Sequence, residues 1–394
     1  MTIRLVLISV MALVALHPRA ICAQTLRTDS TDMPAITGEA HPSAPVLRTD
    51  LPGMPADSTQ APPKKSWLAK VVGFFDFNNP DPRYISPNLY NFTFMLNTSS
   101  SYEYYKIAST GTHEQSISFA PSPSRKLGAY FGWRWIFLGW SVDVDDIFGS
   151  KQGKSKKTEY NLSLYSAKVG VDFYYLKSGN RFKVKGLSGF EDIGSQDIGK
   201  EFRFDGLKVN MMGINAYYIF NNRRFSYPAA FSQSTNQRKS AGSFLTGFSY
   251  STHKLMFDYR QLPPELISQL EPSLRFQKIR YHDYSLNFGY AYNWVFAKNC
   301  LACLSVTPAI AYKKAGITSK EEGYDAETYH SVNFDVITRA AIVYNNAKYY
   351  VGASLLAHTY DYHKKRFWIN NTYGILQIYV GFNFNKKKEF RNRQ

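Results

Sequence analysis

Two cysteines three residues apart are the first candidates for chemistry in this sequence. Cys300 and Cys303 form a C-x-x-C motif, which serves elsewhere as a redox pair or as half of a zinc site. The chain has three cysteines, too few for a second such pair. On a β-strand, side chains three residues apart point to opposite faces. We therefore expect either a chance spacing beside a turn or a local disulfide.

Histidines are the second candidates. None of them stands in a metal spacing such as H-E-x-x-H, and the sequence contains neither a G-x-S-x-G motif nor a P-loop. The sequence therefore predicts no catalytic residue, no cofactor and no metal. The histidines of the C-terminal three quarters are expected to lie in loops or in a lumen: His113, His253, His282, His330, His358 and His363.

A third set of polar residues shares one feature, an inward-facing position in alternating segments. Ion pairs among these residues would most often be structural, because neighbouring opposite charges neutralise each other. The alternative is a pore in which Asp335 and Arg339 impose charge selectivity. The candidate lumen cluster consists of Arg134, Asp143, Asp283, Asn287, Asp335, Arg339 and His358.

The elements that would position this cluster are strands, best seen in residues 283–296. Every second residue there is apolar or aromatic, from Tyr284 to Phe296, and the residues between are small or polar. A period of two predicts a strand. A strand of a soluble protein would turn such a face to a core, whereas a strand of an outer-membrane barrel turns it to lipid. The polar opposite face favours the barrel.

Similar alternation recurs from residue 88 to residue 384. Two pairs of residues between the strands, Lys298-Asn299 and Asn345-Asn346, are predicted two-residue hairpin turns, where a positive φ angle is needed that Asn tolerates. We predict an all-β fold, an antiparallel transmembrane β-barrel of about 12 strands (range 10–14).

Composition agrees with export and with a barrel. Aromatic residues make up 16% of the chain, yet no segment after the N-terminus has 18 consecutive apolar residues. The formal net charge of +17 would suit anionic lipid headgroups or nucleic acid. An export signal excludes nucleic acid as a partner.

The N-terminal segments predict the domain organisation. Arg4 and the apolar stretch 5–16 predict a signal peptide, residues 1–23, cleaved after Ala23. Alternatives are a membrane anchor and lipidation of Cys22. Residues 24–66 hold 7 of 18 prolines and no aromatic residue, which predicts a disordered periplasmic linker. Residues 67–87 form a short helix or lead-in, 88–384 the barrel and 385–394 a basic tail.

Three segments carry a resemblance to a known family: residues 83–105, 129–143 and 221–251. Over about residues 75–384, the chain resembles an uncharacterised family of predicted outer-membrane β-barrels from Bacteroides-type bacteria, a domain of unknown function. The resemblance implies the fold and the membrane, but no functional residue.

We expect a non-enzymatic barrel of the bacterial outer membrane that acts as a channel, a binding platform or a structural element. Its expected partners are outer-membrane lipid, the barrel assembly machinery and a periplasmic protein that binds the linker. A membrane-embedded lipid hydrolase or acyltransferase is one alternative, which would need a nucleophile, a base and an orienting acid within hydrogen-bond reach. A soluble secreted barrel is the other.

Deletion of residues 24–66 is expected to leave the barrel folded, because this segment lacks the apolar residues needed to pack. Heat-modifiable gel mobility measures the folded barrel. Loss of the fast-migrating form on deletion would contradict the expectation.

Overall fold

The computed structural model describes residues 80–110, 114–121, 124–133, 136–144, 157–178, 182–191, 202–318, 328–363 and 367–391. The expected signal peptide and linker, and residues 67–79 of the expected lead-in, lie outside these ranges. Of the expected basic tail, residues 388–391 form a short helix. No helix in the described ranges is long and apolar enough to cross a membrane.

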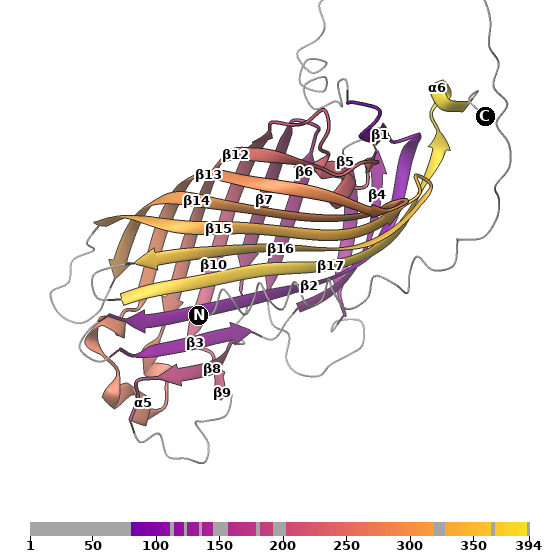
Figure 1. The fold of residues 1–394 in the computed structure, drawn as a ribbon. Coiled ribbons are helices and arrows are strands. Elements are labelled where there is room, and N and C mark those ends of the chain that lie inside the picture. Colours follow the sequence, from indigo (N-terminus) through magenta and orange to yellow (C-terminus); the bar gives the residue numbers. More distant parts are fainter. Residues whose placement is uncertain are drawn as a thin grey trace, which may run out of the picture. The chain divides into compact units, whose positions relative to one another are not determined.

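Strands make up most of the described chain (Figure 1). They are β1 (Ile85–Pro87), β2 (Tyr90–Ser109), β3 (Ser116–Pro121), β4 (Ser124–Trp133), β5 (Ile136–Asp143), β6 (Thr158–Tyr165), β7 (Val169–Lys177), β8 (Phe182–Ser188), β9 (Phe202–Phe204), β10 (Leu207–Ile219), β11 (Thr235–Gln237), β12 (Ala241–Phe257), β13 (Lys278–Ala297), β14 (Cys300–Thr318), β15 (Thr328–Asn345), β16 (Tyr349–His363) and β17 (Phe367–Lys386). The helices are α4 (Tyr227–Phe231), η1 (Tyr259–Gln261), α5 (Pro264–Gln269), η2 (Pro272–Leu274) and α6 (Lys388–Arg391).

Fifteen strands form one antiparallel sheet, and β1 pairs separately with β11. Twelve of the fifteen follow one path: β5-β4-β2-β17-β16-β15-β14-β13-β12-β10-β7-β6. The remaining three, β3, β8 and β9, branch from the far part of β2, where residues 105–108 pair with β3. The prediction of an antiparallel barrel of about 12 strands is confirmed.

Ion pairs connect the two ends of this path. Lys126 on β4 lies 3.8 Å from Glu159 on β6, and Lys157, which precedes β6, lies 2.8 Å from Glu103 on β2. The sheet therefore curves until β6 approaches β2 and β4.

The two faces of β13 differ as the alternation predicts. Leu286, Phe288 and Trp294 are exposed on the outward face, whereas Asn287 and Asn293 are buried on the inward face. The inward residues are small and polar, so they leave room for the hydrogen-bonded network of the lumen.

Connections differ at the two ends of the barrel. We call the end with the β13–β14 and β15–β16 connections the turn end, and the opposite end the loop end. Asn299 has the predicted positive φ of 65°. In the β15–β16 connection, the positive φ of 75° falls on Ala347, so the prediction for Asn346 is wrong. The side chains of Asn345 and Asn346 instead accept hydrogen bonds from the backbone N–H groups of Ala347 and Tyr349, at 2.8 and 2.7 Å.

A large apolar cluster fills the loop end. It combines inward residues of the barrel strands with β3, β8, β9 and the β12–β13 connection, including Phe119, Phe182, Phe257 and Leu266, all of them fully buried. The branch strands and α5 lie together at this end in Figure 1. The connections thus build a packed cap.

An arginine on the outward face at mid-height should cost about 2–4 kcal/mol of barrel stability in a bilayer, and only about 0–1 kcal/mol near the interface. We expect Phe288→Arg to lower the yield of heat-modifiable barrel strongly and Thr252→Arg, outward and near the loop end, to lower it little. Equal yields of the two variants would contradict the assignment of the outward face.

Candidate functional site

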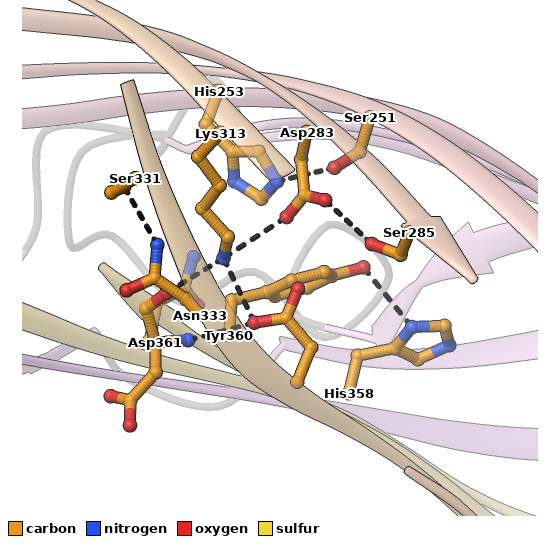
Figure 2. A network of polar contacts seen from close by, with 12 residues as sticks. Ser251, His253, Asp283, Ser285, Lys313, Ser331, Asn333, His358, Tyr360 and Asp361 are labelled. Carbon is orange, nitrogen blue, oxygen red and sulfur yellow. Dashed lines mark hydrogen bonds and ion pairs between the residues drawn. The ribbon is translucent and has the colours of Figure 1, made fainter. Parts of the chain in front are cut away.

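The lumen holds, in its half toward the loop end, a lysine between two aspartates. Lys313 of β14 lies 3.0 Å from a carboxylate oxygen of Asp283 on β13 and donates a 2.8 Å hydrogen bond to Asp335 on β15. All three side chains are almost completely inaccessible to solvent. The lysine also donates to the backbone carbonyl of Asp361 at 2.7 Å. Figure 2 shows Lys313 pointing toward Asp283 and the chain near Asp361.

Strand register brings these groups together. Asp283 lies directly opposite Lys313 in the β13–β14 ladder. Asp335 lies farther along β15, and the long lysine side chain reaches it. The β15–β16 ladder ends at the pair Val336 and Thr359, and beyond it the backbone N–H of Asp361 donates to Asp335 at 3.0 Å. The aspartate therefore replaces a ladder bond and holds the lysine at the same time.

Hydrogen bonds surround this trio. Ser285 donates to Asp283 at 2.6 Å. His358 bonds with the hydroxyl of Tyr360 at 3.1 Å, and that hydroxyl lies 2.6 Å from the hydroxyl of Tyr174. Figure 2 shows Ser285 beside Asp283 and His358 beside Tyr360. Buried charges are stable only when paired and hydrogen-bonded, and the ion pairs with Lys313 and the bond from Ser285 meet part of this need.

A second buried ion pair lies nearer the turn end. The guanidinium of Arg339 on β15 donates a hydrogen bond to Asp172 on β7, across the lumen. Asp172 also accepts from Ser163 at 2.7 Å and from Asn215 at 3.2 Å. The guanidinium lies 5.0 Å from the ring centre of Tyr217, within the range of a cation–π contact.

The β10–β12 connection folds back into the turn end of the lumen. From α4, Tyr227 donates to Ser305 of the wall at 2.7 Å. Gln233 donates to the hydroxyl of Tyr379 at 3.0 Å, and Asn293 donates to the carbonyl of Ser226 at 2.8 Å. Polar bonds to three wall strands therefore hold this connection, which we call the inserted segment (residues 224–238).

Two cavities lie between the inserted segment and the wall, one of about 510 Å³ at the turn end and a smaller one beside β6. The smaller cavity has a volume of about 190 Å³, and its lining includes Asn97, Tyr130, Asn161, Gln233 and Arg339. It is the space left beside β6, where the path of strands ends.

The structure divides the sequence-predicted cluster. Asp283 and Asp335 share Lys313, whereas Arg339 pairs with Asp172. Two further members lie inside the lumen with other partners. Asn287 bonds with Asn215 and Ser249, and His358 bonds with Tyr360.

The two remaining members of the predicted cluster are Asp143 and Arg134. Asp143 lies at the end of β5, half-buried, and accepts from Ser124 at 3.1 Å. It stands opposite Lys126 in the β4–β5 ladder, and its membership of the lumen cluster stays a prediction. Arg134 lies outside the described residues.

Sequence reasoning missed Lys313 and Asp172. Alternation alone could have found both. Tyr312 and Lys314 share the outward parity of β14, which leaves Lys313 inside, and the outward Phe173 of β7 places Asp172 inside.

The two cysteines of the C-x-x-C motif are not joined by a disulfide. Cys303 is a buried free thiol, so it forms no disulfide with Cys300. Among the described residues, no three His, Cys, Asp or Glu side chains are grouped so that they could hold a metal ion.

Comparison with protein families identifies the chain. Residues 79–384 match the family described as domain of unknown function (DUF4421). The chain belongs to the DUF4421 family. This confirms the expected family resemblance, while the expected origin in Bacteroides-type bacteria stays a prediction. No functionally curated protein matches this DUF4421 chain.

Solved structures similar to this DUF4421 chain are distant. The outer membrane protease OmpT from Escherichia coli is 8% identical with a TM-score of 0.36, covering 78% of this chain and 100% of OmpT. The translocator domain of the autotransporter NalP from Neisseria meningitidis is 7% identical (TM-score 0.26; 75% and 89% covered). The outer membrane protein OprG from Pseudomonas aeruginosa is 10% identical (TM-score 0.24; 76% and 98% covered). Likenesses this remote do not carry a functional assignment.

Replacement of Lys313 by methionine should lower the free energy of unfolding by about 3–5 kcal/mol, because it leaves two buried carboxylates without a counter-charge. The adjacent, outward Lys314→Met should change it by less than about 0.5 kcal/mol. The urea midpoint in detergent, read by heat-modifiable mobility, measures both.

Neutralising Asp283 and Asp335 tests whether unpaired carboxylates cause the loss of stability in Lys313→Met. Asp283→Asn and Asp335→Asn, added to Lys313→Met, should recover part of the lost stability. An unchanged midpoint for Lys313→Met alone would contradict the role of the trio.

Proposed function

We propose that this protein is a non-enzymatic barrel of the bacterial outer membrane whose lumen is sealed, and that it acts as a structural element presenting its packed loop-end cap rather than as an open pore. The observation that carries the proposal is the burial of the inward face. Asp283, Asn287, Ala291, Asn293, Ser305 and Lys313 each expose 3% or less of their surface. A water-filled channel would leave such residues accessible.

The outward face supports the membrane position. Tyr284 and Trp294 bound an exposed apolar band on β13. The ten steps from Tyr284 to Trp294, at about 3.3 Å each, span about 33 Å along the strand, or about 25 Å across a membrane at a tilt of about 40°. This equals the apolar band of outer-membrane barrels.

Connection lengths support an orientation. Tyr90 at the start of β2 pairs with Lys386 at the end of β17, so both ends of the barrel sequence lie at the turn end. Bacterial barrels keep short turns on the periplasmic side and long loops outside. At the turn end the long β10–β12 connection does not project but folds back into the lumen. We infer that the turn end faces the periplasm, where an N-terminal linker would meet a periplasmic partner.

The remaining partners follow from this placement. Membrane lipid would contact the apolar band, and the barrel assembly machinery would insert the chain. We infer no nucleic-acid partner, because the protein would function after export.

The purified protein, reconstituted in a planar bilayer, is expected to give no stepwise ion conductance, because charged pairs and the inserted segment occupy the lumen. An open general porin in the same bilayer serves as the positive control. Stable conductance steps, with an ion selectivity that changes in Arg339→Ala, would contradict the proposal and support a pore.

A further inference from the structure

A cluster of basic side chains lies on the outward face near the loop end. Lys254 of β12 stands directly opposite Arg280 of β13. Lys314 of β14 stands opposite His282 and, on its other side, opposite His330. Arg280 and Lys314 are exposed. We call Lys254, Arg280 and Lys314, with the two histidines, the basic patch.

The basic patch borders the apolar band. The next outward row toward the turn end consists of Tyr250, Tyr284 and Tyr312, which are mutual register partners. The row after that is wholly apolar: Phe248, Leu286 and Ile310. Tyrosines at a water–hydrocarbon boundary, with cations just beyond them, are typical of a lipid headgroup zone.

Tyrosine hydroxyls hold the histidines of the basic patch. Tyr250 bonds with Nδ1 of His282 at 3.0 Å, and Tyr312 bonds with Nδ1 of His330 at 2.5 Å. The tyrosine row therefore orders the side chains nearest to the cations.

The basic patch lacks acidic neighbours on its own strands. β12 and β14 contain no Asp or Glu, and the single acid of β13, Asp283, points into the lumen. Like charges directly opposite each other destabilise a sheet, so Lys254 and Arg280 repel each other when no anion is bound. A bound anion would remove this repulsion.

We propose that the basic patch binds the phosphate group of a membrane lipid in the leaflet at the loop end. This inference rests on the proposed membrane position. The planar guanidinium of Arg280 can bind two phosphate oxygens at once, while the ammonium groups of Lys254 and Lys314 add charge. The acyl chains of the same lipid would lie along the tyrosine and apolar rows.

The test measures lipid retained by the purified barrel in phosphatidylcholine nanodiscs. The nanodiscs contain a small fraction of either phosphatidic acid, which carries a phosphate monoester, or neutral diacylglycerol. Wild type should retain phosphatidic acid selectively, and 10 mM inorganic phosphate should not displace it. The triple variant Lys254→Gln, Arg280→Gln, Lys314→Gln should retain at least about tenfold less phosphatidic acid. Each Lys or Arg near an anionic lipid surface strengthens binding to it, and this variant removes three.

A matched control removes the same charge at the turn end: Lys298→Gln, Lys348→Gln, Lys386→Gln. This variant should retain phosphatidic acid as wild type does. Equal loss in both triple variants, or equal retention of diacylglycerol by wild type, would overturn the inference. Complete displacement by inorganic phosphate would show a free-anion site and would also overturn it.

Acids in the β14–β15 connection are the competing partners. Residues 319–327 lie outside the described residues, and their sequence contains Glu321, Glu322, Asp325 and Glu327. Selective retention only after these four are changed to amides would overturn the inference. Fast gel mobility and membrane fractionation distinguish failure of this inference from failure of the proposed function. A folded, membrane-bound protein without lipid selectivity refutes the basic patch alone. A protein found outside the membrane refutes the proposed function.

Discussion

A buried charge in this barrel must find its partner inside the lumen, and most of the interior is arranged around that constraint. Lys313 faces Asp283 and Asp335, and Arg339 faces Asp172. The first set joins three consecutive strands, β13, β14 and β15, whereas the second joins strands that are distant in the sequence. Removing one partner leaves an uncompensated charge at a cost of several kcal/mol, whereas the intact pair contributes little net stability. The pairs therefore select one arrangement of strands more than they strengthen it.

Alternation along a strand was enough to predict the fold and part of the lumen. The parity of β13 and β15 placed Asp283, Asp335 and Arg339 inside, and the same rule applied to β14 would have added Lys313. Which inward residues touch cannot be read from parity, because it depends on register and on how far the sheet curves. Asp172 and Arg339, 167 residues apart, meet across the lumen only after the sheet has curved.

Two other features had no sequence signal that alternation could capture. The inserted segment follows a strand and contains a proline and several polar residues, so its sequence is typical of an ordinary surface connection. The segment lies in the lumen because it supplies hydrogen-bond partners for polar side chains of the wall, such as Ser305 and Asn293. The turn at Ala347 was mispredicted because the side chains of two asparagines, rather than their backbone angles, stabilise it.

The polar interior also solves a register problem that an apolar interior would create. Side chains alternate with a period of exactly two residues, so a slip of one residue exchanges the faces of a strand. With apolar residues on both faces, a slipped β14 would lose little. In the observed sheet, the same slip would turn Lys313 outward, away from Asp335, and would leave Asp283 without its register partner Lys313. Two adjacent lysines thus specify which face of β14 points to the lumen: Lys313 is bound by aspartates inside, and Lys314 belongs to the basic patch outside.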